Sequence, residues 1–399
     1  MNFQIDRNTL LRALERTRNA VITYRETYKQ GGWFDVFKCY IFTADCDQLT
    51  IETSNSEIYM RETVSIGNPT ADDKKTFAVN AKQLISAIKS LDGQSLEFDV
   101  LEYQVIVRHS IGSFALPIFE GIEDYSARRK PAINYDTAQH IEMEAPGLRS
   151  ILNRLAFAMA DDDLRPVMNG VVISMKKEHT DFVASDGHVL AKIRKQSITT
   201  EKPADVVLPR RIIGILQKVL PTTGFVEMDF NAFDVNWPTD SKEPQPAPVY
   251  QIIVDGLTIV GRPIEGRYPN YDSVIPTRFS KGFTTDRVAL IKSLERLSQF
   301  TNNSGLITIH LNNGSVKMDA ADYDFSLSAT EVLPCSYYGD PFKFGLQDFR
   351  LIKMLKSIVA ATEATFRILD QSRAFIIEPG VQPLSEEITM LIMPMLIND

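Results

Sequence analysis

The chain has 399 residues, 44% of them hydrophobic and 24% charged, which is the composition of a folded globular protein rather than a disordered or fibrous one. A formal net charge of −8 argues against a protein that coats nucleic acid with its whole surface, but leaves room for a local basic face. Three cysteines without CxxC spacing argue against a disulfide framework or a zinc ribbon, and no apolar run approaches the roughly 20 residues that span a bilayer. We therefore expect a cytoplasmic protein with no membrane partner, no metal and no cofactor.

Six stretches carry apolar residues at i, i+3, i+4 and i+7, the pattern of amphipathic helices. In chain order they are Asn8–Val21, Leu84–Leu91, Gly147–Ala160, Ile212–Leu220, Asp286–Phe300 and Leu351–Ile358. The first, third and fifth begin at positions 8, 147 and 286, so their starts are 139 residues apart. The distance from the first to the second helix of a pair is 76 residues, then 65 and again 65. These spacings predict one unit present three times, with an insertion of about 11 residues at Tyr24–Phe37 in the first copy.

Runs rich in Val, Ile, Phe and Thr lie between the helices, with period-two alternation, as in Leu96–Leu116, Gly170–Gly187 and Leu306–Thr330. They predict antiparallel strands and hairpins. We therefore expect an α+β fold of three repeated domains, each with two helices packed on antiparallel sheet. Proline-containing joints at 125–136 and 269–278 predict domains 1–134, 135–273 and 274–399, and the proline-rich segment 236–248 is predicted to be a solvated loop.

Positive charge is concentrated in the six predicted helices. Counted with their flanking residues, the helices hold 17 basic and 5 acidic residues, whereas the rest of the chain has a net charge of −20. The windows counted are Arg7–Val21, Asn80–Asp92, Ala145–Ala160, Pro209–Leu220, Thr285–Thr301 and Leu346–Ile358. A charged face on a single helix is ordinary, but the same bias on six helices favours a common surface for the phosphates of duplex DNA, bound without sequence specificity. The candidate DNA-binding residues, opposite the apolar stripes, are Arg12, Arg16, Lys82, Lys89, Arg149, Arg154, Arg210, Arg211, Lys218, Lys292, Arg296, Arg350 and Lys353.

The sequence lacks the common catalytic motifs. It has no Walker loop, GxGxxG, HExxH or GxSxG, and its five histidines have no metal-ligand spacing. The string Ser185-Asp186-Gly187-His188 places a hydroxyl, a carboxylate and an imidazole together. A hydrolase or phosphoesterase that uses Asp186 and His188 is therefore an alternative hypothesis. A tight turn between two strands is favoured, because catalytic triads are built from distant segments.

Three stretches closely resemble signature segments of the bacterial sliding clamp family, the β subunit of DNA polymerase III. They are Val183–Arg194 (VASDGHVLAKIR), Glu265–Pro276 (EGRYPNYDSVIP) and Leu391–Leu396 (LIMPML), and the similarity extends over the whole chain in matching order. The resemblance implies a head-to-tail homodimeric ring of six domains, with twelve helices lining the inside and sheets outside. It also implies a DNA replication processivity factor that encircles duplex DNA and has no catalysis of its own.

The resemblance further implies partners and the surfaces that bind them. The partners are a second copy of the chain, the replicative polymerase subunit, the clamp loader and other replication or repair proteins that carry short clamp-binding peptides. The implied peptide pocket comprises Met168, Ser185, Gly187, His188, Val189, Leu190, Pro269, Val274, Leu391, Ile392, Met393, Pro394 and Met395. An open alternative for Leu391 and Ile392 is that they only seal the contact between two units. The implied dimer interface includes Phe114, Leu116 and Phe300.

The chain also departs from the family pattern. Val189, Asp272 and Ser273 stand where the family usually has arginine, and Ile397–Asp399 continue beyond the usual end. The aromatic insertion replaces a Leu-Pro-rich turn of the first unit.

Overall fold

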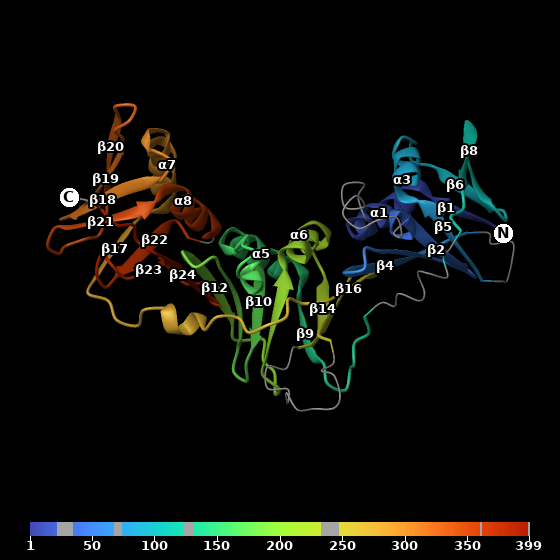
Figure 1. Ribbon diagram of the computed structural model, residues 1–399, viewed down its shortest axis with the longest axis horizontal. Coiled ribbons are helices and arrows are strands. Elements are labelled where there is room, and N and C mark those ends of the chain that lie inside the picture. The colour runs from blue at the N-terminus through green and yellow to red at the C-terminus, as the bar shows by residue number, and fades with distance from the viewer. Residues whose placement is uncertain are drawn as a thin grey trace. The chain divides into compact units, whose positions relative to one another are not determined.

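The structure is a computed structural model that describes residues 1–21, 35–67, 74–120, 122, 131–232, 247–359 and 361–397. Helices and antiparallel strands alternate along these residues, as the sequence predicts (Figure 1). Most of the two predicted insertions, 24–37 and 236–248, lies outside the described residues. Val36 and Phe37, at the end of the first insertion, are buried core residues. Within the described ranges, no helix is long and apolar enough to cross a membrane.

One order of elements occurs three times in the described part of the chain: a strand, a helix, four strands, a second helix and three strands. The first copy contains β1 (Asn2–Asp6), α1 (Arg7–Thr17), β2 (Cys39–Asp45), β3 (Gln48–Ser54), β4 (Ile58–Ser65), β5 (Lys75–Asn80), α3 (Ala81–Lys89), β6 (Ser95–Val100), β7 (Gln104–His109) and β8 (Gly112–Pro117). The second contains β9 (Gln139–Glu144), α5 (Ala145–Leu155), β10 (Gly170–Met175), β11 (Thr180–Ser185), β12 (Val189–Lys195), β13 (Ala204–Pro209), α6 (Arg210–Val219), β14 (Phe225–Asn231), β15 (Val249–Val254) and β16 (Leu257–Gly261). The third contains β17 (Lys281–Asp286), α7 (Arg287–Leu297), β18 (Leu306–Asn312), β19 (Ser315–Asp322), β20 (Leu327–Pro334), β21 (Phe342–Gln347), α8 (Asp348–Ser357), β22 (Glu363–Ile368), β23 (Phe375–Pro379) and β24 (Glu387–Ile392).

The predicted equal spacing of the copies is slightly wrong. The first helices begin at Arg7, Ala145 and Arg287, which are 138 and 142 residues apart rather than 139. The sequence prediction took each start from the apolar pattern, whereas α1 and α7 begin directly after a capping aspartate. Asp6 accepts a hydrogen bond from Thr9 N at 2.8 Å, and Asp286 accepts one from Ala289 N at 2.6 Å.

The residue contacts divide the chain into two compact units. The first comprises Met1–Pro146, Lys218–Ala232 and Lys242–Pro263, and the second includes Gly147–Gln217 and Ile264–Asp399. The first unit holds a four-stranded sheet, β1-β6-β7-β8, and an eight-stranded sheet, β5-β2-β3-β4-β16-β15-β14-β9. The second holds the eight-stranded sheet β13-β10-β11-β12-β24-β23-β22-β17 and the four-stranded sheet β20-β19-β18-β21.

Each eight-stranded sheet joins strands of two neighbouring copies. β4 pairs with β16 in one unit, and β12 pairs with β24 in the other, both antiparallel. The second copy is therefore divided between the two units, and the domain boundaries 1–134, 135–273 and 274–399 stay a prediction.

Helices pack on these sheets through the stripes that the sequence predicts. α1 buries Leu10, Ala13, Leu14 and Thr17, the i, i+3, i+4 and i+7 positions of one face. This face belongs to the same hydrophobic cluster as residues of β1, β2, β5 and β6. In the third copy α7 and α8 lie side by side (Figure 1). The opposite face of α1 carries the exposed Arg12.

Candidate functional site

The string Ser185-Asp186-Gly187-His188 forms the tight turn between β11 and β12. Oδ1 of Asp186 accepts hydrogen bonds from the backbone N–H groups of His188 and Val189, each at 2.8 Å. Gly187 has a φ of +88°, a conformation that favours glycine. Oδ2 of Asp186 pairs with Arg350 of α8. The turn is thus confirmed, and its carboxylate is held by the backbone and by Arg350 rather than by a histidine side chain.

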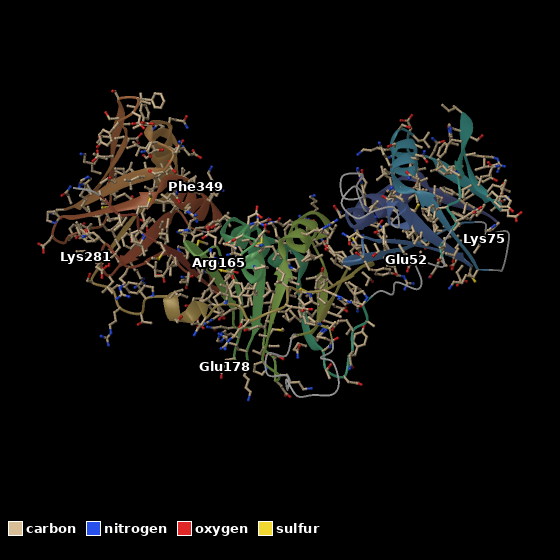
Figure 2. The ribbon with its side chains drawn as sticks, viewed as in Figure 1. Glu52, Lys75, Arg165, Glu178, Lys281 and Phe349 are labelled. Atoms are coloured by element: carbon tan, nitrogen blue, oxygen red, sulfur yellow. The ribbon has the colours of Figure 1, made fainter. Side chains whose placement is uncertain are left out.

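Arg165 lies against this turn, a position that sequence reasoning missed. Its Nη2 donates to the carbonyl of Asp186 at 3.4 Å, and its Nε donates to Asp162 at 3.1 Å. A Cβ atom at Gly187 would lie 2.8 Å from Nη1 of Arg165. Figure 2 shows Arg165 among the side chains of the second copy. No local pattern predicts this proximity, because a strand pair separates the two positions along the chain.

The end of the chain passes beside the same turn. β24 pairs with β12, so that Leu391 lies opposite Leu190 and Ile392 opposite Val189. After the strand, Met393 N donates to the carbonyl of His188 at 2.9 Å, and Met395 N donates to the carbonyl of Gly345 on β21, also at 2.9 Å. Met393 is 40% exposed. These contacts place flexible apolar side chains at the surface next to the turn.

A connector, residues 262–280 between β16 and β17, covers part of the second unit's eight-stranded sheet. Its Tyr268 and Tyr271 are buried and pack in one cluster with Val172, Leu190 and Leu391. Val274, at the end of the 3-10 helix Tyr271–Val274, is 55% exposed. The connector thus carries predicted peptide-site residues and is held to the sheet by its tyrosines.

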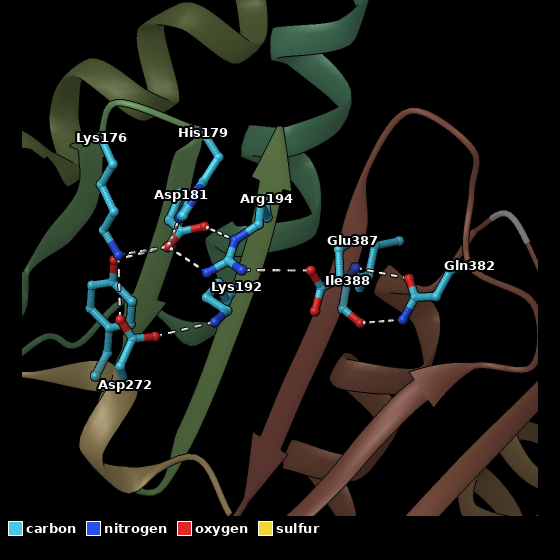
Figure 3. Close-up of polar contacts among 10 residues, drawn as sticks. Lys176, His179, Asp181, Lys192, Arg194, Asp272, Gln382, Glu387 and Ile388 are labelled. Atoms are coloured by element: carbon cyan, nitrogen blue, oxygen red, sulfur yellow. Dashed lines mark hydrogen bonds and ion pairs between the residues drawn. The ribbon is translucent and has the colours of Figure 1, made fainter. Parts of the chain in front are cut away.

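A polar cluster fastens the connector to the sheet (Figure 3). Asp181 of β11 is fully buried and accepts hydrogen bonds from Arg194 Nε at 2.7 Å, Lys176 Nζ at 3.1 Å and the Tyr271 hydroxyl at 3.2 Å. Burial alone would raise the pKa of Asp181, but the hydrogen bonds and positive charges of Arg194 and Lys176 outweigh it and lower the pKa to about 2. The carboxylate is therefore ionised across the physiological range.

Two of the departures from the family pattern have partners in this structure. Asp272 accepts hydrogen bonds from Lys176 and Lys192, each at 3.3 Å, and so extends the polar cluster (Figure 3). Ser273 Oγ donates to the carbonyl of Asn270 at 2.7 Å. An arginine at position 272 would face these two lysines. The acidic residue therefore suits its surroundings.

The structure separates the predicted peptide-site residues into two groups. Exposed or half-buried are Ser185, Gly187, His188, Pro269, Val274, Met393, Pro394 and Met395. Buried are Met168, Val189, Leu190, Leu391 and Ile392, none of them more than 5% exposed. Strand pairing between β12 and β24 places Val189, Leu190, Leu391 and Ile392 in the core, and Met168 is buried at the end of the 3-10 helix Pro166–Met168. Their assignment to the peptide pocket stays a prediction.

The predicted DNA-binding residues also separate by exposure. Exposed are Arg12, Lys82, Lys89, Arg210, Arg211, Lys218, Lys292, Arg296 and Lys353; half-buried are Arg16, Arg149 and Arg350. Arg154 is buried, so its predicted place on an exposed helix face is wrong. It lies against Glu386, whose carboxylate attracts it into the interior. Arg16 and Arg350 are likewise engaged, with Glu62 and Asp186.

The predicted interface residues lie near two edge strands. Phe114 and Leu116 belong to β8, the last strand of one four-stranded sheet, and pack on the core of the first copy. Phe300 is half-buried in the 3-10 helix Ser298–Phe300, which contacts β20, the first strand of the other four-stranded sheet.

Comparison with known proteins identifies the family. One family model, described as the DNA polymerase III beta subunit, N-terminal domain, matches residues 1–127. A second, the central domain of the same subunit, matches residues 142–270, so that together they span more than half of the chain. The chain belongs to the DNA polymerase III beta subunit family.

Relatives and solved structures agree over the full length. The chain is 24% identical to the beta sliding clamp of Pseudomonas putida, over 99% of this chain and all of the relative. A crystal structure of the DNA polymerase sliding clamp from Pseudomonas aeruginosa has a TM-score of 0.85 at 21% identity and covers both chains completely. The Helicobacter pylori beta clamp bound to a DNA ligase peptide has a TM-score of 0.82 at 17% identity, again with complete coverage of both chains. These structures share the fold of this chain.

Proposed function

We propose that this chain is a sliding clamp, a non-catalytic processivity factor of DNA replication. Two protomers form a head-to-tail ring around duplex DNA, hold it without sequence specificity and tether DNA polymerase and other proteins through short peptides. Family membership supports this function. The proposal rests on a strand pairing that occurs twice within the chain. It leaves one unpaired edge strand in the first copy and one in the third, and these two strands are equivalent to the pairs that form inside the chain.

The pairing follows one rule within the chain. The fourth strand of one copy pairs with the last strand of the next, as β4 with β16 and β12 with β24. The third copy has the equivalent fourth strand, β20, and the first copy has the equivalent last strand, β8. Each lies at an edge of a four-stranded sheet. Edge strands are usually protected, and pairing β20 of each protomer with β8 of the other protects both.

The two internal pairings predict the register of the third. Ile58 lies opposite Gly261, and Val189 lies opposite Ile392. When positions are matched through the strand ladders and helix starts, Leu327 is equivalent to Ile58 and Val189, and Leu116 to Gly261 and Ile392. The predicted opposite pairs are therefore Leu327 with Leu116, Ser328 with Ala115, Ala329 with Phe114, Thr330 with Ser113 and Glu331 with Gly112.

Side-chain chemistry agrees with this register. Phe114 and Leu116 face the helix side of their sheet, since they pack in the core cluster that includes α1. Glu331 faces α7, where it pairs with Arg296, and alternate residues of a strand share a face, so Leu327 also faces the helices. Leu327 is 42% exposed in the single chain. Pairing it with Leu116 buries an apolar side chain that otherwise contacts water.

The helices provide a surface for DNA. Arg12, Lys82, Lys218, Lys292 and Lys353 are exposed and come from five helices, one or two in each copy. Such side chains attract phosphates through long-range electrostatics and need no base contacts. In a closed ring, topology keeps the protein on DNA while the contacts remain mobile. Arg16, Arg154 and Arg350 are not part of this proposed surface.

The proposed peptide site comprises the exposed residues around the β11–β12 turn, the connector and the end of the chain. Met393 and Val274 supply exposed apolar surface, and methionine adapts to different side chains. A relative, the Helicobacter pylori beta clamp, was crystallised with a DNA ligase peptide. A short apolar peptide is therefore the ligand class that we propose for this surface.

The domain boundaries and the location are part of the proposal. β1–β8, β9–β16 and β17–β24 fall within 1–134, 135–273 and 274–399, which supports three domains with these limits. Replication takes place in the bacterial cytoplasm, and we place the protein there.

Disulfide cross-linking tests the ring. Ser328→Cys and Ala115→Cys are introduced together, with Cys46 and Cys335 replaced by serine. Directly opposite Cβ atoms lie about 4.5–5.5 Å apart, close to the spacing that a disulfide needs, whereas diagonal neighbours are about 7–8 Å apart. Oxidation should yield a covalent dimer. Thr330→Cys with Ala115→Cys, a diagonal pair, is the matched control and should cross-link poorly.

The cross-linked dimer then tests encirclement. Loaded on nicked circular DNA before oxidation, the cross-linked ring should stay bound in high salt and be released when the DNA is linearised. A chain that sediments as a monomer at micromolar concentration, or a cross-linked dimer released equally from circular and linear DNA, contradicts the proposed function.

A further inference from the structure

We propose that Arg296 closes the joint between protomers by donating hydrogen bonds to backbone carbonyls at the β7–β8 turn of the second protomer. The proposal rests on the ring described above. It comes from an arginine that all three copies share. Arg16, Arg154 and Arg296 each occupy the tenth residue of the first helix of their copy.

Arg16 shows what this arginine does where strands of two neighbouring copies pair, as β4 does with β16; we call such a pairing a joint. Its Nη1 pairs with Glu62 of β4 at 2.9 Å and donates to the carbonyl of Asp255 at 3.0 Å. Its Nη2 donates to the carbonyl of Val254 at 2.9 Å. Val254 and Asp255 lie at the β15–β16 turn, which leads into the strand that pairs with β4. The arginine therefore ties its own copy to the hairpin of the next copy, and its side chain is only 12% exposed.

Arg154 does the same at the second joint with a different partner. Its Nη1 and Nη2 donate to the two carboxylate oxygens of Glu386, the residue just before β24 in the β23–β24 hairpin. The two side chains are 5% and 9% exposed. Both internal joints thus bury this arginine against the hairpin whose last strand completes the sheet.

Arg296 has half of this arrangement. Its Nε and Nη2 donate to the two carboxylate oxygens of Glu331 at 2.6 and 2.5 Å. Glu331 of β20 holds the same ladder position as Glu62 of β4. The Arg296 side chain is nevertheless 60% exposed, and its Nη1 donates no hydrogen bond within the described residues. Glu331 supplies the carboxylate of its own copy, and α7 belongs to the last copy, so no later copy follows in the described chain to contribute a hairpin.

The β7–β8 hairpin supplies the missing part in a second protomer. His109 lies opposite Gly112 across its two-residue turn, as Val254 lies opposite Leu257 across the β15–β16 turn. Matching the two hairpins by register places His109 and Ser110 at the positions of Val254 and Asp255, whose carbonyls meet Arg16, although the φ of Asp255 is +46° and that of Ser110 is not positive. Ile111 in the same turn is 90% exposed. The turn is therefore free to meet a second copy of the chain.

This assignment changes the predicted role of Arg296 from a DNA contact to a joint residue. The planar guanidinium of arginine carries several N–H donors, so it can bond a carboxylate and backbone carbonyls at the same time. The single ammonium group of lysine cannot make all of these contacts together. We therefore expect Arg296→Lys to be a poor replacement even though it keeps the charge.

The test measures the dissociation constant of the dimer by sedimentation equilibrium. Losing the charged hydrogen bonds of one joint should cost about tenfold in affinity. Both joints break when the ring separates, so Arg296→Gln should raise the constant by about 100-fold, and Arg296→Lys should also raise it. Lys292→Gln, an exposed cation on the same helix, is the matched control and should leave it unchanged. All three variants should keep the parent's thermal stability as isolated chains, because residue 296 is exposed there.

The outcomes separate the two proposals. If Arg296→Gln and Arg296→Lys dimerise like the parent while the Ser328→Cys, Ala115→Cys pair cross-links, the role of Arg296 is wrong and the ring stands. A parent chain that neither dimerises nor cross-links overturns both. Equal weakening by Lys292→Gln would mean that general charge, rather than the joint, is responsible, and would also overturn the role of Arg296.

Discussion

Arg154 and Glu386 form a buried ion pair that links α5 to the β23–β24 hairpin, with Arg154 Nη2 and Glu386 Oε2 3.0 Å apart. Lys195 also reaches the carboxylate, at 3.0 Å. Burial would raise the pKa of Glu386, but Arg154 and Lys195 outweigh it and lower that pKa. A residue that the helical pattern placed on a DNA-facing surface is thus a structural contact between the second and third copies.

Replacing Arg154 with glutamine should destabilise the chain by about 3 kcal/mol, because breaking a buried ion pair leaves a carboxylate without its main partner. Lys195 remains, which keeps the loss at the lower end of the usual range. Chemical denaturation measures the free energy of unfolding. Lys353→Gln removes an equal charge from an exposed site and should change it by less than about 0.5 kcal/mol. Equal effects of the two substitutions would contradict the buried contact.

Asp181 should make stability depend on pH. Its pKa is about 2 in the folded chain and about 3.9 in an unfolded one. The folded pKa is depressed, so the stabilisation is fully present above about pH 5 and is lost as the pH falls toward 2. It amounts to about 2–3 kcal/mol at pH 7.

Asp181→Asn should therefore lower the free energy of unfolding at pH 7 and flatten its decline between about pH 5 and 2. Urea denaturation at several pH values provides the measurement. Asp205→Asn, an exposed carboxylate on β13, is the control and should keep the parent's profile. A parallel decline in Asp181→Asn and the parent would show that another group is responsible.

Reversing the charge of Arg12, Lys82, Lys292 and Lys353 to glutamate should weaken loading and retention on DNA, because it removes positive charge from exposed helix faces. The fold should survive, since exposed substitutions usually cost little stability. Retention on nicked circular DNA across a range of salt concentrations gives the readout. The same change at Lys74, Lys177, Lys202 and Arg278, exposed residues outside the helices, is the matched control. If both sets lose retention equally, the helices are not the DNA surface.

Replacing Met393 and Met395 with alanine should reduce the affinity for a polymerase-derived peptide with Gln and Leu or Phe anchors. Each apolar anchor gains roughly 1.5–3 kcal/mol on burial, so the loss should reach at least tenfold. Fluorescence polarisation titration measures the affinity, and sedimentation checks that the dimer persists. Val381→Ala with Leu384→Ala, two exposed apolar residues of the β23–β24 loop, should bind like the parent. Unchanged affinity of the methionine variant would exclude the end of the chain from the site.

The sequence by itself determined the features that depend on local pattern. Apolar periodicity located the six helices, alternation located the strands, and repetition revealed three copies, because these signals depend on residues a few positions apart. Asp186 and Gly187 likewise predicted a turn from their own conformational preferences. The resemblance of three short segments also sufficed to identify the family.

Tertiary structure alone decided which side chains meet. Helical periodicity separates a buried face from an outer face, but it cannot tell whether Arg154 on that outer face meets water or a carboxylate more than 200 positions away. For the same reason, Leu391 and Ile392 became core residues only when β24 paired with β12. The partners of Asp181 and Arg16 likewise come from separate strands and hairpins. Contacts between distant segments depend on how sheets of neighbouring copies join, and no local pattern in the chain encodes that geometry.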